Sequence, residues 1–374
     1  MLSLPEIDRH PGFVLTAAAD LREDALAAFE QAFGGKTYDN PEALCASPDV
    51  DLVYICTPNY LHAEHAILAA EHRKHVLVEK PMAISVDECT RMIAAAERNA
   101  VQLMTGHAHS YDPPIRLMRD LVRGGELGAL VMLQTWNFTD LMYRSRAAWE
   151  LDTSQGGGVV FIQGPHQVDV VRFIGGGLVR SVRARALVAD PERPTEGAYT
   201  VFLEFEDGTP ATLVYSGYGH FDTGEFTFWL SGTGAPRSRD QHARTQRAYL
   251  QQRESASREA RRFGGTFNRE AGLTERHQPF FGLTLVSCQR GDVRQSPDGV
   301  IVIDDDGQRE ISLPAGASGR QNMLDEVFQA IASGEPAVHD GRWGRATVEV
   351  LCALLESSRT HREVALSHQV ALTD

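Results

Sequence analysis

The sequence predicts an α/β protein in which a doubly wound parallel sheet precedes an α+β domain. Over the first hundred or so residues, short apolar runs alternate with segments of helical spacing, and this order favours parallel strands with right-handed crossovers. After about residue 112, apolar and polar residues alternate within the runs, which is typical of half-exposed antiparallel strands. Because 374 residues exceed the usual size of one domain, we expect domains over residues 1–110 and 111–374.

The predicted parallel sheet has four strands and three helices. Ser85, with Glu88 three residues later, forms a capping-box start for the third helix. No G-x-G-x-x-G loop precedes the first strand, so the expected first strand and phosphate-binding loop are missing. Either the domain has lost them or the sequence starts at an internal methionine, and we favour the second because an orphaned sheet centre would be costly. We expect strands at residues 13–19, 52–56, 76–78 and 102–105, and helices at 22–33, 61–72 and 85–99.

The second part mixes helices with strands of alternating character. Two β runs flank Asp207-Gly208, a turn pair typical of hairpins. The Arg-rich stretch at about residues 237–276 indicates an insertion, either a solvated lid or an oligomer arm. The remaining elements are expected as helices at 113–123, 322–332 and 346–357 and as strands at 130–138, 300–303 and 310–313.

Composition excludes several classes of function. Thirty-six basic and fifty acidic side chains leave a net charge of -14, which disfavours nucleic-acid binding. No apolar run approaches the roughly 20 residues needed to cross a membrane, and no signal peptide is recognisable. The five cysteines are scattered and odd in number, as in a reducing compartment. We therefore expect a soluble cytoplasmic protein with no membrane partner.

Two positions at strand ends point to a nucleotide. Asp20 follows the first strand, where a doubly wound domain places the acid that binds an adenosine ribose; a helix N-cap explains it equally well. Lys80 follows the strand at 76–78 and precedes Pro81. A lysine there can stabilise a developing alkoxide, although a surface lysine beside Glu79 is an even alternative.

The segment at residues 156–169 indicates an acid–base site. Pro165 fits the first position of a helix, so His166 lies in the first turn, with Asp169 three residues later on the same face. A carboxylate can orient an imidazole and raise its basicity, as a general base requires. The catalytic interpretation is favoured over a first-turn polar cluster, because the run Gly156-Gly157-Gly158 suggests close approach of a ligand or another segment.

Metal and nucleophilic chemistry find little support. No H-E-x-x-H motif and no carboxylate or cysteine at ligand spacing accompanies the histidines, so a solvated helix face is favoured and no metal is expected. Ser216 and Cys56 lack a neighbouring base at recognisable spacing. The histidines in question are His62, His65, His72 and His75.

Four segments combine in a specific way: YICTPN at 54–59 followed by Leu61-His62, HVLVEKP at 75–81, GGELG at 124–128, and GGGVVFIQGPHQVD at 156–169. Together they resemble the glucose–fructose oxidoreductase and inositol dehydrogenase (Gfo/Idh/MocA) family over nearly the whole chain. The resemblance implies an N-terminal Rossmann domain, a C-terminal α+β domain with a large, mostly antiparallel open sheet, NAD or NADP as cofactor, and a homo-oligomer (dimer or tetramer).

By position, the resemblance makes Lys80 the motif lysine and His166 the catalytic histidine. Asp20 matches the ribose contact, so NAD is favoured over NADP. Two departures matter: the family's frequent aspartate before the histidine is Ile162 here, followed by Gln163, and its Arg-Arg-Phe is His109-Ser110-Tyr111. Both argue against a polyol pocket. The cofactor-binding residues implied are Asp20, Arg22, Thr57, Pro58, Asn59, His62, Glu79 and Lys80.

Further segments resemble the branch of the family that contains phthalate 4,5-cis-dihydrodiol dehydrogenases, among them GHAHSYDPP at 106–114 and HDGRWGRATVEV at 339–350. This branch implies NAD-dependent oxidation of a small-molecule cis-dihydrodiol to a catechol, in which arginines bind substrate carboxylates. A sugar or inositol dehydrogenase and a non-catalytic NAD-responsive binding protein are the alternatives, and a metal-dependent hydrolase is a distant third. The substrate-binding residues expected are Arg144, Arg146, Gln163, Asp169 and His109.

Overall fold

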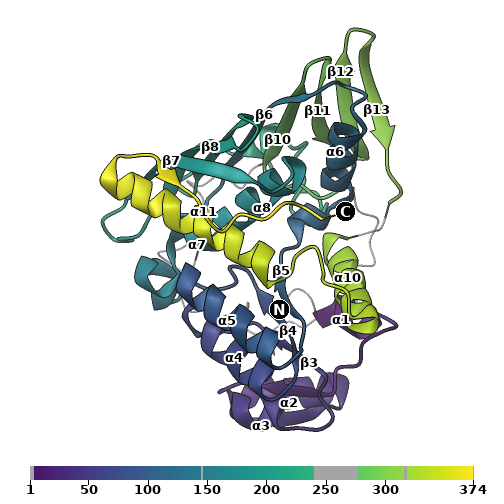
Figure 1. Cartoon of the computed structure of the whole chain (residues 1–374), viewed down its shortest axis with the longest axis vertical. Coiled ribbons are helices and arrows are strands. Elements are labelled where there is room, and N and C mark those ends of the chain that lie inside the picture. Colours follow the sequence, from purple (N-terminus) through teal and green to yellow (C-terminus); the bar gives the residue numbers. More distant parts are fainter. Residues whose placement is uncertain (1–3, 145, 240–276, 316–317, 374) are drawn as a thin grey trace.

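The computed structural model describes residues 4–144, 146–239, 277–315 and 318–373 (Figure 1). Nearly all of the predicted Arg-rich insertion lies outside the described residues. None of the described helices is long and apolar enough to cross a membrane. The division into domains at residue 110 stays a prediction.

The N-terminal part contains two parallel sheets, β1-β2 and β3-β4-β5. Within the described residues no strand joins β1 to β3, so the doubly wound sheet is interrupted where the missing strand was expected. The strands are β1 (Ala17–Ala19), β2 (Lys36–Tyr38), β3 (Leu52–Ile55), β4 (His75–Glu79) and β5 (Leu103–Gly106). The helices between them are α2 (Glu23–Phe33), α3 (Pro41–Cys45), α4 (His62–Glu71) and α5 (Val86–Arg98).

Strand β4 shows how the helices cover both faces of its sheet. Val76 and Val78 belong to a buried cluster with residues of α4 and α5, whereas Leu77 packs with α10 (Gly319–Ser333) and α1 (Leu4–Arg9). Alternate side chains of a strand point to opposite faces, so a continuous apolar run is buried on both sides. Helix α10, although late in the chain, therefore lies against the N-terminal sheet, beside α1 (Figure 1).

The C-terminal part is built on one large sheet, with nine strands among the described residues in the order β13-β12-β11-β10-β6-β9-β8-β7-β14. The pairing is antiparallel except between β6 and β9. Both parts of the fold class are thereby confirmed. The strands are β6 (Leu130–Phe138), β7 (Val179–Leu187), β8 (Ala198–Phe205), β9 (Pro210–Ser216), β10 (Leu283–Cys288), β11 (Gly291–Ser296), β12 (Gly299–Asp304), β13 (Gly307–Ser312) and β14 (Val364–Ala365).

Helices on one side of this sheet carry residues toward the N-terminal part. Helix α11 (Gly341–Thr360) contacts β7, α5 and α8 (Gly164–Ile174), and so links the two parts. Helices α6 (Pro113–Gly124) and α7 (Gly158–Ile162) complete the layer. Helix α8 follows α7 directly. Its first turn carries residue 166 to a cavity that is also lined by the ends of β4 and β5 and is described next.

Local signals in the sequence are confirmed at several element ends. The backbone N–H of Glu88 donates to Ser85 Oγ, and Glu88 in turn accepts from the N–H of Ile84. Asp207 and Gly208 form the turn between β8 and β9, with Gly208 at φ 86°, a region that favours glycine.

Candidate active site

A cavity of about 540 Å³ lies between the carboxyl ends of β3, β4 and β5 and the large sheet. Tyr54, Glu79 and Gly106 line it from the N-terminal side, and residues of β6 and β9 line it from the other. Ligands of open α/β sheets bind outside the carboxyl ends of the strands, so this is the expected place for a substrate next to a nucleotide.

Lys80 lines this cavity directly after β4. Its ammonium group donates to the carbonyl oxygen of Ile162, at 3.0 Å, which fixes the side chain beside the end of α7. Burial lowers the pKa of Lys80, Glu79 opposes the shift, and Arg146 and Arg320 lower the pKa further. Lys80 and the start of α8 are thus brought together, as the sequence predicted.

His166 lines the same cavity from the first turn of α8, with Pro165 at the helix start. Its ring lies 4.8 Å from the ring of His109 and 4.7 Å from that of Phe281. Within the described part of the chain, its buried Nδ1 has no hydrogen-bond partner. Burial lowers the pKa of His166 well below 6.5, and the charge of Lys80 adds to the shift. The imidazole is therefore unprotonated at neutral pH, and its environment makes it a weaker base than a free histidine.

We expected a carboxylate beside His166, but the carboxylate–histidine contact at this cavity is made by a different histidine, His109. Asp112 Oδ2 lies 2.8 Å from Nδ1 of His109, which also lines the cavity. Burial raises the pKa of Asp112, and the neighbouring His109 opposes this shift. A carboxylate–imidazole pair of the kind that orients a base is thus present at His109.

Asp169 does not lie in the cavity, and its interpreted role as the partner of His166 is wrong. Its side chain is 1% exposed, and Oδ1 accepts from Nε1 of Trp343, at 2.7 Å, and lies 3.2 Å from Nε2 of His339. Successive turns of a buried helix face different neighbours, and the residue at 169 faces α11. A substrate contact at Asp169 would require it to leave this buried cluster.

The predicted cofactor residues lie along the carboxyl ends of the parallel strands. Asp20 follows β1, where its Oδ1 accepts from the N–H of Arg22 at 2.9 Å. The two side chains are 27% and 28% exposed and lie 3.5 Å apart. The carboxylate thus closes a local turn but does not cap α2, whose N-cap is Arg22, so the helix-cap interpretation is wrong; the side chain also reaches solvent, where a ribose hydroxyl could donate to it.

The segment after β3 is held by contacts within the protein. Thr57 Oγ1 lies 3.1 Å from His65 Nδ1, and Asn59 donates to the carbonyl of Gly156 at 2.8 Å. The ring of His62 lies between the carbonyl oxygens of Thr57 and Pro81, each at 2.8 Å. These side chains shape the backbone that a cofactor would approach. Among the described residues no metal-binding cluster of histidine, cysteine or carboxylates is present.

The glycine run before α7 is explained by packing of the chain on itself. A side chain at Gly156 would meet Ile84 and Asn59, and one at Gly158, whose φ is 73°, would meet Thr195. The close approach predicted from the glycines is therefore made by other protein segments.

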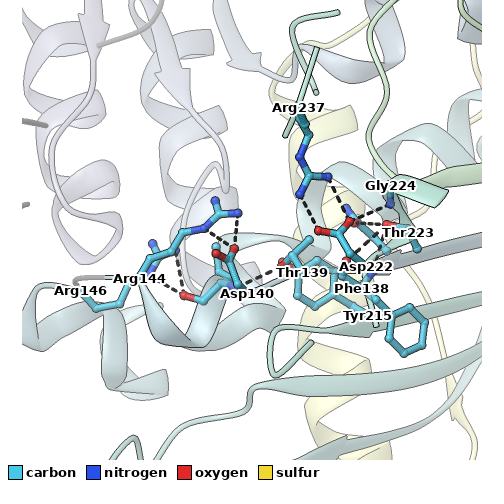
Figure 2. Close-up of polar contacts among 12 residues, drawn as sticks. Phe138, Thr139, Asp140, Arg144, Arg146, Tyr215, Asp222, Thr223, Gly224 and Arg237 are labelled. Carbon is cyan, nitrogen blue, oxygen red and sulfur yellow. Dashed lines mark hydrogen bonds and ion pairs between the residues drawn. The ribbon is translucent and has the colours of Figure 1, made fainter. Parts of the chain in front are cut away.

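The arginines expected to bind carboxylates already have partners. Arg144 lines the cavity and pairs with Asp140, Nη2 to Oδ1, at 2.6 Å. Arg146 pairs with Glu150 at 2.8 Å and is not among the lining residues. Figure 2 shows Arg144 turned toward Asp140. Gln163 lines the cavity, as expected.

Several lining residues had no signal in the sequence. Arg237 lines the cavity and forms a two-pronged pair with Asp222 (Figure 2). Arg320 and Met323 reach it from α10. These residues lie far from the recognised motifs in sequence, and only the packing of α10 on the N-terminal sheet brings Arg320 here.

The interrupted doubly wound sheet, the lysine after β4 and the cavity beside it define a nucleotide-dependent oxidoreductase. Residues 3–107 match the oxidoreductase family with an NAD-binding Rossmann fold (GFO/IDH/MocA), and residues 115–235 match the GFO/IDH/MocA C-terminal domain. The chain belongs to the GFO/IDH/MocA family. The predicted resemblance, the dehydrogenase class and NAD as the cofactor are thereby confirmed.

Individual relatives extend over nearly the whole chain. A 1-carboxy-3-chloro-3,4-dihydroxycyclohexa-1,5-diene dehydrogenase from Comamonas testosteroni is 35% identical, covering 96% of this chain and 92% of its own. The structure of a dehydrogenase from Bordetella bronchiseptica RB50 is 39% identical with a TM-score of 0.91, over 98% and 96% of the chains. Levoglucosan dehydrogenase, in complex with NADH and levoglucosan, shares the fold at 17% identity and a TM-score of 0.74, over 97% and 94%.

Proposed function

We propose that this dehydrogenase oxidises a carboxylated cyclic cis-dihydrodiol to the corresponding catechol. The observation that carries the proposal is that the imidazole of His166 and the ammonium group of Lys80 line the same cavity. The name of the Comamonas relative describes a carboxylated diene diol, which supports the same substrate class. A general base and a fixed positive charge beside one ring hydroxyl are what oxidation of a carbinol needs.

The two side chains have different roles in this proposal. His166 takes the hydroxyl proton, directly or through a water molecule, and Lys80 stabilises the negative charge that develops on the oxygen. Bound NAD supplies the acceptor for the hydride that leaves the carbinol carbon. The resulting enone tautomerises to the aromatic diol, which makes the oxidation effectively one-way. His109, held by Asp112, and Gln163 also line the cavity and would contact the second ring hydroxyl.

The cofactor would lie along the carboxyl ends of β1 and β3–β5. Asp20 would bind the adenosine ribose, and the segment Thr57-Pro58-Asn59, held by His62, would follow the backbone of the dinucleotide. The exposed carboxylate of Asp20 and the continuity of these strand ends with the cavity support this placement. Arg22 would accompany Asp20, and Glu79 would face the nicotinamide side.

The cavity lining combines apolar and polar side chains, so it can accept a ring that has apolar faces and polar substituents. Leu141, Leu230, Phe280, Phe281 and Met323 contribute apolar surface to its lining. Polar side chains such as Asn137, Gln163 and Ser231 share the lining, so the choice of a dihydrodiol over a polyol rests on the substrate named for the Comamonas relative. Phthalate 4,5-dihydrodiol is the finer candidate that the sequence suggested, and a monocarboxylated dihydrodiol is the candidate that the Comamonas relative suggests.

A substrate panel tests the proposal. The enzyme is incubated with NAD and, in separate reactions, with the cis-dihydrodiol of benzoate, that of phthalate, uncarboxylated benzene cis-dihydrodiol and myo-inositol, and the absorbance of the NADH formed is followed. We expect the highest kcat/KM with a carboxylated dihydrodiol. Oxidation of myo-inositol alone would overturn the proposal in favour of a polyol dehydrogenase. NAD binding, measured on the same samples, separates loss of the cofactor from lack of a substrate.

A further inference from the structure

The arginine side chains that line the cavity differ in whether a carboxylate of the protein pairs with them. Arg144 pairs with Asp140 and Arg237 pairs with Asp222 through both of its terminal nitrogens. Figure 2 shows each of these two guanidinium groups turned toward its own carboxylate. A guanidinium that already donates to a carboxylate has part of its charge offset and fewer N–H donors left for a second carboxylate.

Arg320 lines the same cavity, and its side chain makes no hydrogen bond or ion pair with the described residues. The charge of Arg320 lowers the pKa of Asp112, but Asp112 Oδ2 is engaged with His109 and the carboxylate also accepts from the backbone N–H of Gly319. Arg320 therefore keeps its donors available on the cavity side.

The position of Arg320 in its helix strengthens this argument. It is the second residue of α10, whose first turn contains no acidic residue. The N-terminus of a helix carries partial positive charge, so a cation there is unfavourable unless an anion is nearby. The charge of Arg320 also lowers the pKa of Lys80 and of His166, which places it within electrostatic reach of the two groups assigned to the reaction.

We propose that Arg320 is the carboxylate subsite of this cavity, and that the cavity accepts one carboxylate rather than two. The inference rests on the proposed function for its substrate class. A guanidinium binds a carboxylate through two parallel hydrogen bonds. With Arg144 and Arg237 already paired, the ring of a bound dihydrodiol would carry its carboxylate toward α10 and its hydroxyls toward Lys80 and His166. The preferred substrate is then a monocarboxylated dihydrodiol.

Ligand binding tests the subsite without any turnover. Isothermal titration in the presence of NAD compares 3,4-dihydroxybenzoate with catechol, which differ only by the carboxylate. We expect the wild-type protein to bind the carboxylate about 10- to 100-fold more tightly, the usual range for a charge-assisted hydrogen-bond pair. R320Q should reduce this preference to less than about threefold, and R320K should restore part of it.

Arg116→Gln is the matched control. Arg116 pairs with Glu326 of α10 at 3.6 Å but does not line the cavity, so this variant removes one positive charge from the same region. We expect R116Q to keep the wild-type preference. Thermal unfolding of each variant identifies those that are folded, and R320K keeps the test informative if R320Q is not.

Three results would overturn the inference. The first is a wild-type protein that does not distinguish the two ligands, and the second is an R320Q variant that keeps the preference. The third, tenfold tighter binding of 4,5-dihydroxyphthalate than of 3,4-dihydroxybenzoate, would overturn the single-carboxylate part. If carboxylate binding depends on Arg320 but no dihydrodiol is oxidised, the proposed function fails while the subsite stands.

Discussion

His166 and Asp169 lie three residues apart on helix α8, and the structure gives them opposite surroundings. His166 opens onto the cavity, whereas Asp169 is sealed against α11 with an exposure of 1%. The same short helical segment thus borders the cavity at His166 and contacts only other protein segments at Asp169. Helical spacing therefore predicts which polar residues lie near each other on a helix. It does not predict their partners, which depend on how distant segments of the chain pack.

The sealed layer is defined here by Asp169, His107, His339, Arg172 and Trp343. Arg172 is 0% exposed, its guanidinium lies 3.9 Å above the ring of Trp343, and burial lowers its pKa to about 9. Burial alone would raise the pKa of Asp169, but His107 and His339 outweigh it and hold that pKa below its usual range. This layer therefore contains one buried carboxylate and one buried guanidinium, and it fixes α8 behind the cavity.

The largest effect is expected for the residues on the open side. His166→Asn and Lys80→Met should each lower turnover by about 10²–10⁴-fold, since each removes a group that acts on the transferred proton or on the developing charge. NAD affinity and thermal stability should remain close to those of the wild-type protein. Steady-state kinetics and NAD titration on the same preparations check this, and wild-type turnover in either variant would remove the proposed mechanism.

Asp169→Asn should act on the folded state instead. It removes the carboxylate that accepts from Trp343 and offsets the buried charge of Arg172, and a buried charge left without compensation costs about 3–5 kcal/mol. Urea unfolding measures the loss. Asp112→Asn is the matched control, because Asp112 is equally a buried carboxylate beside a histidine, but that histidine, His109, lines the cavity. If D169N left stability unchanged and abolished turnover alone, the division into an open and a sealed side would be wrong.

Local patterns in the sequence were enough to predict β1 and β3–β5 but not the short parallel strand β2. Val76, Leu77 and Val78 are at most 1% exposed, and a fully buried strand reads as a continuous apolar run. Strand β7 had no such signal, because its exposed Arg180, Arg183 and Arg185 interrupt the run. The β6 and β8–β9 strands were predicted because their polar positions are less strongly charged.

The site could be predicted only in the part that a local motif carries. Lys80 and His166 stand out in the sequence, and the structure brings them to one cavity. The partner of Asp169 could not be predicted, because Trp343 lies 174 residues away along the chain. Arg320 had no signal for the same reason: its role depends on α10 returning to the N-terminal sheet.

The smallest effect is a dependence of stability on pH. It shows whether His107 in the sealed layer is neutral or protonated in the folded protein. Burial lowers the pKa of His107 to about 4, with Asp169 opposing the shift. Between pH ~6.5 and ~4, His107 is protonated in the unfolded chain but remains neutral in the folded protein. The free energy of unfolding should therefore fall by about 3 kcal/mol over this range as the pH drops. The depressed pKa of Asp169 contributes only below its unfolded value of about 3.8, so it does not disguise this fall.

Urea unfolding of the wild-type protein and of His107→Gln, at pH about 7.5 and about 5, measures this contribution. The variant should lose less stability between the two pH values, and the remaining slope belongs to other buried histidines such as His166 and His62, whose pKa values are also lowered. A steeper slope in the variant would mean that His107 is protonated in the fold and forms an ion pair with Asp169. In that case His107 would stabilise the protein more as the pH falls, and it would be a third charged group in the sealed layer, beside Asp169 and Arg172.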